Sequence, residues 1–188
     1  MVMMTIFPTD CLQQVCKASM ELQGSCHCRR IYFSVISHTP QPFMYCYCSI
    51  CRKTQGGSGA AINIMGDYRT LIIQQGEQYL KMYQAVQNYE EPLEKRHLVG
   101  NHRYFCQECG SYLYAYNPKY PDNVYPYASA IDTPLPKAVE AVHIMQDFKA
   151  NWVPVPQSTS EVASKVYARY PDIGGIEIWH KKNGQYID

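Results

Sequence analysis

The chain has 188 residues, of which 46% are hydrophobic, and its 17 basic and 16 acidic side chains give a net charge of +1. This length suits one domain with a single core, and the near-neutral charge gives no field that would draw the chain onto nucleic acid or an anionic membrane. No stretch approaches the roughly 20 apolar residues of a membrane span, and the opening MVMMTIFPTD lacks the basic start of a secretory signal, so we expect a soluble, cytoplasmic protein with no nucleic-acid or membrane partner.

Short strand-type segments dominate the first two thirds of the chain. They are too short for helices and rich in tyrosine and β-branched residues. The clearest four are residues 31–36, 60–65, 79–83 and 112–116. Turn-forming residues separate them at 37–42, 55–59 and 117–123. This pattern predicts a mainly β domain, a sandwich or an open barrel.

Two helices are expected within this β pattern. The first is short, begins near Ser49 and ends at the glycine pair Gly56-Gly57. The second covers Ser158–Tyr170, because Ser158 and Glu161 have the spacing of a capping box and apolar residues recur every four positions after it.

The C-terminal sequence IEIWHKKNGQYID contains Asn183-Gly184, a pair typical of hairpin turns, and therefore predicts a small strand pair. No internal repeat or long linker divides the chain. We expect an N-terminal segment at 1–19, a zinc-binding β domain at 20–156, and a helix and strand extension at 157–188 that packs on this domain.

Seven of the nine cysteines lie in three clusters: CHC at 26–28, CYCSIC at 46–51 and CQEC at 106–109. In a reducing compartment such close-set cysteines are more typical of metal ligands than of disulfides. A C-x-x-C pair on a tight turn can hold two thiolates about 2.3 Å from one zinc ion. Gly110 suits the left-handed bend that follows such a turn.

Counting ligands divides these clusters between two zinc ions. A structural zinc binds four protein ligands. The third cluster supplies two cysteines, and the first cluster is the simplest source of the other two. This gives a four-cysteine set: Cys26, Cys28, Cys106 and Cys109. The middle cluster leaves a cysteine triplet: Cys46, Cys48 and Cys51. Three protein ligands with an open fourth position are typical of a catalytic zinc.

Candidate substrate-binding groups follow the triplet directly. Three thiolates around a dication leave a charge of about −1, which Arg52 and Lys53 could offset, and the same two cations could hold a substrate carboxylate. Gly56 and Gly57 offer backbone amides that no side chain obstructs. The alternative is that Arg52 and Lys53 form only a solvated helix face.

Other interpretations of the cysteines stay open. The outer clusters could be reduced, buried thiols. The triplet could hold a second structural zinc with a histidine as fourth ligand: His27, His97 or His102. Cys11 and Cys16 are expected to be free thiols.

The segments GSCHC, YCYCSICRKTQGG, RYFCQECGSYLY, SAIDTPLPKAVEAVHI and NWVPVP resemble, in this order, the family of glutathione-dependent formaldehyde-activating enzymes and centromere protein V. The resemblance covers roughly residues 20–156. It implies a β-tent fold of small antiparallel sheets around two zinc ions, a structural one in the four-cysteine set and a catalytic one in the triplet.

The resemblance also implies a function, that of a carbon–sulfur lyase acting on glutathione or a related thiol adduct, of the S-hydroxymethylglutathione synthase type. The alternative is a non-catalytic zinc or binding module of the centromere protein V type, which would need a basic patch that the sequence lacks. His143 and Asp132 are candidate proton carriers. A homo-oligomer is compatible with the sequence, which carries no signal for one.

Two positions depart from the family pattern. Tyr47 stands between the first two cysteines of the triplet, where the family usually has histidine. Arg29 follows the first cluster, where the family usually has glycine. The first departure bears on the substrate, and the second adds a cation or decorates the end of a strand.

Overall fold

The structure is a computed structural model that describes residues 19–55, 57–154 and 156–188. Cys11, Cys16 and Gly56 lie outside the described residues. Within the described part no helix is both long and apolar enough to cross a membrane.

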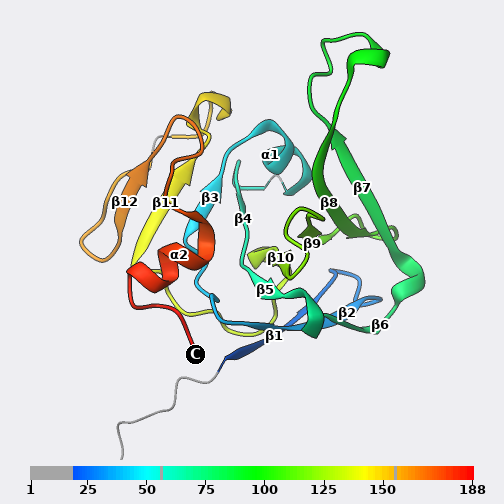
Figure 1. The fold of residues 1–188 in the computed structure, drawn as a ribbon, viewed down its shortest axis with the longest axis horizontal. Helices are drawn as coiled ribbons and strands as arrows, with labels where there is room; N and C mark the ends of the chain where they lie inside the picture. The colour runs from blue at the N-terminus through cyan, green and yellow to red at the C-terminus, as the bar shows by residue number, and fades with distance from the viewer. Residues whose placement is uncertain (1–18, 56, 155) are drawn as a thin grey trace, which may run out of the picture.

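Three β-sheets form the molecule (Figure 1). The first has the order β1-β2-β6: Met20–Ser25, Tyr32–Ser37 and Ile72–Gln75. The second has the order β5-β10-β9-β8-β7: Gly66–Asp67, Asn123–Pro126, Tyr112–Tyr116, Leu98–Cys106 and Leu80–Val86. The third has the order β12-β11-β3-β4: Ala163–Val166, Glu140–Ile144, Met44–Cys46 and Ala61–Ile62.

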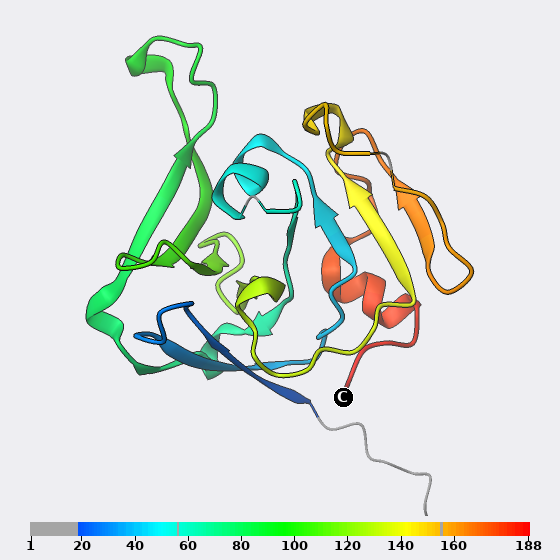
Figure 2. The ribbon, with the colours of Figure 1, turned by 180° about the vertical axis from the view of Figure 1, so that it is seen from behind.

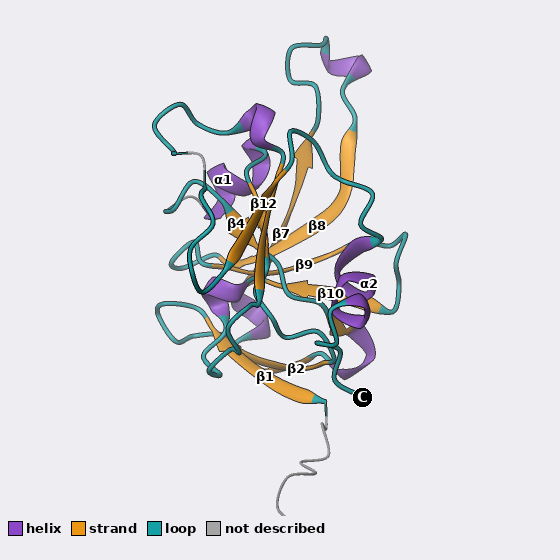
Figure 3. Cartoon of the chain, turned by 90° about the vertical axis from the view of Figure 1, so that its left-hand side faces the viewer, coloured by secondary structure: helices purple, strands orange, loops and turns teal. Residues whose placement is uncertain are grey.

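Helices are few and short. The α-helices are α1, Ser49–Gln55, and α2, Gly175–Lys182. Single turns of 3-10 helix lie between strands: Tyr68–Thr70, Glu77–Tyr79, Leu93–Lys95, Ala128–Ala130 and Gln146–Phe148. Figure 3 shows α1 and α2 on different sides of the strands.

The predicted fold class is confirmed, since the chain is mainly β with small sheets and a short helix after the middle cysteine cluster. β9 covers the same residues as the predicted strand 112–116, and β2 and β7 overlap two others. One detail differs. The first two sheets are antiparallel, but in the third sheet β11 runs parallel to both β3 and β12.

The helix predicted over Ser158–Tyr170 is wrong. Ser158 Oγ accepts a hydrogen bond from the backbone N–H of Ser164 at 3.0 Å, and Thr159 closes a turn with Val162. The chain then continues as β12, which pairs with the edge of β11. Valines spaced four apart fit a helix face and also an extended strand, and here the open edge of β11 selects the strand.

The hairpin predicted around Asn183-Gly184 is also wrong, because these residues end α2. Gly184 has a left-handed backbone with φ of 62°, and the N–H of Asn183 donates to the carbonyl of Trp179 at 3.0 Å. Glycine and asparagine commonly end helices in this way. The predicted C-terminal helix therefore exists, but at Gly175–Lys182.

Two packed regions place the functional elements. The largest buried cluster lies between the first and second sheets: Leu22, Phe33, Leu113, Val124 and Tyr127 are among its members. A second cluster fixes α2 beside β3 and β11, where Trp179 stacks on Phe43 with ring centroids 3.8 Å apart. Figure 2 shows α2 in this position, seen from behind. The second cluster attaches the C-terminal part of the chain to the sheet that carries Cys46.

Candidate metal centres and the adjoining cavity

The four-cysteine set is assembled by two turns far apart in sequence. The β1–β2 turn carries the first pair and the β8–β9 turn the second. Cys26 Sγ and Cys28 Sγ lie 3.5 Å apart, Cys28 Sγ and Cys106 Sγ lie 3.8 Å apart, and all four sulfurs lie within 4.8 Å of one another. None is in a disulfide. Four sulfurs about 2.3 Å from one zinc in a tetrahedron lie roughly 3.8 Å apart, so this set fits one ion.

The backbone of both turns is bent to suit this role. Gly110 has φ of 72°, as predicted for the residue after the C-x-x-C pair, and its N–H donates to the carbonyl of Cys106 at 2.8 Å. On the other turn, the N–H of Ile31 points at Cys26 Sγ from 3.3 Å. Backbone amides directed at a sulfur stabilise its thiolate form.

The cysteine triplet lies where the third sheet meets α1. Cys46 ends β3, Cys48 precedes α1, and Cys51 lies in the first turn of α1. The three sulfurs lie within 4.8 Å of one another, and none of the described histidines belongs to this group. Because the sulfurs are this close, they interact and their pKa values move apart. Hydrogen bonds from Cys46 and Cys51 lower the pKa of Cys48 to about 2, whereas contacts with Cys48 and Cys51, together with burial, raise the pKa of Cys46.

A cavity of about 920 Å³ opens beside the triplet. All three cysteines line it, and its opposite wall comes from the C-terminal segment 170–178, which includes the start of α2. Polar side chains from the second sheet and its loops also line it, among them Asn101, Arg103, Asn117, Tyr120, Asn123 and Tyr125. This volume can hold a tripeptide-sized molecule.

Of the described residues that line this cavity, Arg103 is the only basic one. It is only 5% exposed, and its charge acts on the neighbouring Cys51 thiol and Tyr127 hydroxyl. No motif in the sequence marks this arginine as a site residue. An arginine in the middle of a strand resembles a solvent-facing residue, and only the pairing of β8 between β7 and β9 turns this one inward.

Comparison with known proteins identifies the family of this chain. The family described as "Glutathione-dependent formaldehyde-activating enzyme" matches residues 21–147. The chain belongs to this family. A Halomonas elongata protein named after the same family is 43% identical over 166 residues, which are 88% of this chain and 98% of that protein. A solved Rhodobacter sphaeroides structure is 21% identical and covers 62% of this chain and 92% of that chain, with a TM-score of 0.45.

The family match confirms the resemblance read from the cysteine motifs. It ends at residue 147, however, whereas the segment 170–178 lies beyond it. The family core therefore supplies the triplet and Arg103, and residues after the core supply a wall of the cavity.

Tyr47, which replaces the usual family histidine, does not line the cavity. Its ring is 5% exposed and packs with Ala60 and Val153, and its hydroxyl lies 3.0 Å from His143 Nδ1. His143 also stacks on Tyr45. Tyr47 thus packs the segment between Cys46 and Cys48 against buried residues outside the cavity lining. Burial lowers the pKa of its partner His143.

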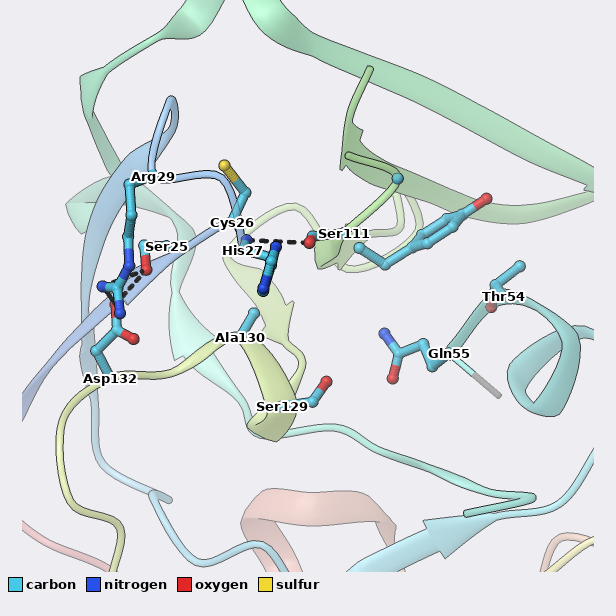
Figure 4. Close-up of a pocket in the computed structure, with 12 residues that line it drawn as sticks. Ser25, Cys26, His27, Arg29, Thr54, Gln55, Ser111, Ser129, Ala130 and Asp132 are labelled. Atoms are coloured by element: carbon cyan, nitrogen blue, oxygen red, sulfur yellow. Dashed lines mark hydrogen bonds and ion pairs between the residues drawn. The ribbon is translucent and has the colours of Figure 1, made fainter. Parts of the chain in front are cut away.

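Arg29, which replaces the usual family glycine, occupies a left-handed backbone position with φ of 61°. Such a position costs a residue with a side chain about 1–2 kcal/mol, which explains a preference for glycine. The side chain recovers part of this cost: Nη1 donates to Ser25 Oγ at 3.1 Å and lies 3.6 Å from Asp132 Oδ2 (Figure 4).

A smaller cavity of about 410 Å³ adjoins Cys26 (Figure 4). Asp132 lines it, and Thr54 and Gln55 at the end of α1 border it. Asp132 is therefore beside the four-cysteine set rather than the triplet. The predicted substrate-binding residues Arg52, Lys53 and Gly57 line neither of these cavities.

Proposed function

We propose that this chain is a zinc-dependent carbon–sulfur lyase that forms and cleaves the adduct of glutathione with formaldehyde. The observation that carries this proposal is the cysteine triplet at the wall of a cavity large enough for glutathione, in a member of this family. The name of the Halomonas elongata relative supports the same activity.

Two zinc ions fit the two sulfur groups by donor type and spacing. The four-cysteine set would hold one ion with a complete shell. The triplet would hold the other, and when bound there zinc supplies a Lewis acid with an open position for a sulfur ligand.

The chain's own residues bind and enclose the substrate. In the forward direction the glutathione thiol gives up its proton and its sulfur forms a bond to the aldehyde carbon. The second bond of the carbonyl group breaks, and its oxygen takes up one proton, which balances the one lost by the thiol, to become a hydroxyl group. Asn101, Asn117 and Asn123 place amides on the cavity wall. Asn117 Nδ2 donates to Asn101 Oδ1 at 2.8 Å, and the N–H groups that this bond leaves unused can meet the peptide groups of glutathione. The wall at 170–178 limits access of water to the reacting sulfur.

Other sequence-based expectations remain predictions. These are the cytoplasmic location, the absence of nucleic-acid and membrane partners, the domain limits at residues 19 and 156, and substrate binding by Arg52, Lys53, Gly56 and Gly57. Glutathione or one of its adducts remains the proposed small-molecule partner, and homo-oligomer formation remains open to measurement.

The test compares zinc-loaded Cys48→Ser with the unaltered chain. We expect the variant to keep its far-UV circular dichroism, to lose about one zinc ion per chain, and to form S-hydroxymethylglutathione no faster than the spontaneous reaction. Cys16→Ser is the matched control, because it is the same substitution outside all three cysteine clusters. Undiminished turnover by Cys48→Ser would refute the proposal, and an unaltered chain that binds zinc without turnover would favour the binding-module alternative.

A further inference from the structure

Arg103 is a buried cation that has no carboxylate partner among the described residues. Its Nε is buried and makes no hydrogen bond within the described residues, and its Nη1 donates to the carbonyl of Asn101 at a long 3.4 Å. The guanidinium also interacts with the Tyr127 hydroxyl, a neutral group that does not balance its charge. No carboxylate of the described chain lies within 4.0 Å of the guanidinium, because the six ion pairs formed there involve other residues. A buried charge with unfilled donors is costly unless an anion completes its shell.

The position of Arg103 shows where such an anion would come from. The side chain lines the cavity beside Cys51, so a molecule whose sulfur reaches the triplet passes directly by the guanidinium. The acidic residues that line the same cavity, Asp172 and Glu177, belong to the C-terminal wall, and Glu177 is paired with Lys181. Arg103 is thus the cation that borders the space proposed for the substrate, and the acidic residues on that cavity wall are not paired with it.

We infer that Arg103 binds a carboxylate of the thiol substrate and so selects thiols that carry an acid group near the sulfur. This inference rests on the proposed function and names the recognition element of its substrate site. Arginine suits this role because its planar donors match both oxygens of a carboxylate.

A rival explanation is that Arg103 only offsets the negative charge of the three thiolates. The two explanations differ in one measurable respect. A charge-balancing arginine changes zinc affinity and treats acid and amide ligands alike, whereas a carboxylate-binding arginine distinguishes the acid from its amide.

The experiment measures binding to the zinc-loaded chain by calorimetry. Glutathione is compared with its two mono-amides, each of which lacks one carboxylate. We expect one mono-amide to bind the unaltered chain about 10- to 100-fold more weakly than glutathione, the range for a hydrogen bond to a charged group. In Arg103→Gln the difference in affinity between glutathione and this mono-amide falls to about twofold or less, because the cation that distinguishes the acid from its amide is absent.

Two further variants sharpen the comparison. Arg103→Lys keeps the charge without the planar fork and retains part of the difference. Arg96→Gln is the matched control, because Arg96 contacts the carbonyl of Glu91 in the β7–β8 loop and lines neither cavity. It should bind all three ligands as the unaltered chain does.

Three results would overturn the inference: equal binding of glutathione and both mono-amides by the unaltered chain, an undiminished difference in Arg103→Gln, or a change in zinc affinity alone. If Arg103→Gln does not fold, the unaltered chain and Arg103→Lys decide the question. Failure of the unaltered chain to bind glutathione would instead contradict the proposed function. The same comparison with 3-mercaptopropionate and its amide would then decide the role of Arg103.

Discussion

Trp179 offers the sharpest test of how the C-terminal segment is attached. Its indole is 4% exposed, stacks on Phe43 at a centroid distance of 3.8 Å and donates from Nε1 to Glu140 Oε1 at 3.0 Å. Glu140 also pairs with Lys165 of β12. The Trp179 side chain therefore connects α2 to Phe43, the residue before β3, and to Glu140 of β11, which also pairs with Lys165 of β12.

Replacing Trp179 with alanine removes this stack and the hydrogen bond together. Substitutions of a buried aromatic residue by alanine cost about 3–5 kcal/mol, a large part of the roughly 5–15 kcal/mol that stabilises a typical domain. We expect a loss in this range in urea unfolding of the zinc-loaded chain, followed by circular dichroism. We also expect a higher KM for glutathione, because fewer molecules keep the cavity wall in place.

The chain provides its own control. Trp152, the second of its two tryptophans, is 66% exposed, and Trp152→Ala should change the free energy of unfolding by no more than about 0.5 kcal/mol. The reasoning fails if Trp179→Ala costs less than about 1.5 kcal/mol, well under the usual range. It also fails if the variant is destabilised as expected and its KM does not change, since α2 would then be irrelevant to the cavity.

Three further changes test the remaining parts of the fold. Cys106→Ser should abolish metal-dependent folding, seen as loss of far-UV dichroism, because the four-cysteine set joins two distant turns; a folded variant with one zinc would contradict this. Arg29→Gly should leave the melting temperature unchanged or raise it, since relief of about 1–2 kcal/mol of left-handed strain outweighs an exposed ion pair worth about 0–1 kcal/mol; a marked drop would show that the pair with Asp132 matters more. Burial lowers the pKa of His180 below the 6.5 of a free imidazole, so the unfolded state binds the proton more tightly and the free energy of unfolding decreases as the pH falls below about 6.5. His180→Gln should therefore reduce the dependence of the free energy of unfolding on pH in this range. An unchanged pH dependence would show that His180 is not its source.

Local patterns in the sequence were sufficient to predict the two groups of cysteines. Cysteine spacing within a turn is set by the few residues between the ligands, and the glycine after the C-x-x-C pair reports the bend directly. The strand at 112–116 and the helix after Ser49 are similarly local. The pairing of the first cluster with the third followed from ligand counting alone.

The C-terminal part was predicted poorly because its signals fit two structures. Asn183-Gly184 closes hairpins and also ends helices, and only the burial of Trp179 and His180 on one face of α2 decides between them. The valines near residue 162 gave a similar ambiguity. In both places a neighbouring element decides between the two structures: β11 for the valines, and the buried cluster around Phe43 for Asn183-Gly184. Local sequence patterns do not show which elements will lie next to each other in the fold.

Strand β8 links the two metal centres. Cys106 at its end belongs to the four-cysteine set, and Arg103, three residues earlier, lines the cavity beside the triplet. An odd separation places the two side chains on opposite faces of a strand, so one strand connects the four-cysteine set to the cavity beside the triplet. β7 and β9 pair with this strand on both sides, with a register shift against β9 between Tyr104 and Phe105. The zinc ion proposed for the four-cysteine set would therefore have two effects. It would stabilise the fold, and by holding the end of β8 it would fix the position of Arg103, which we infer to bind the substrate's carboxylate.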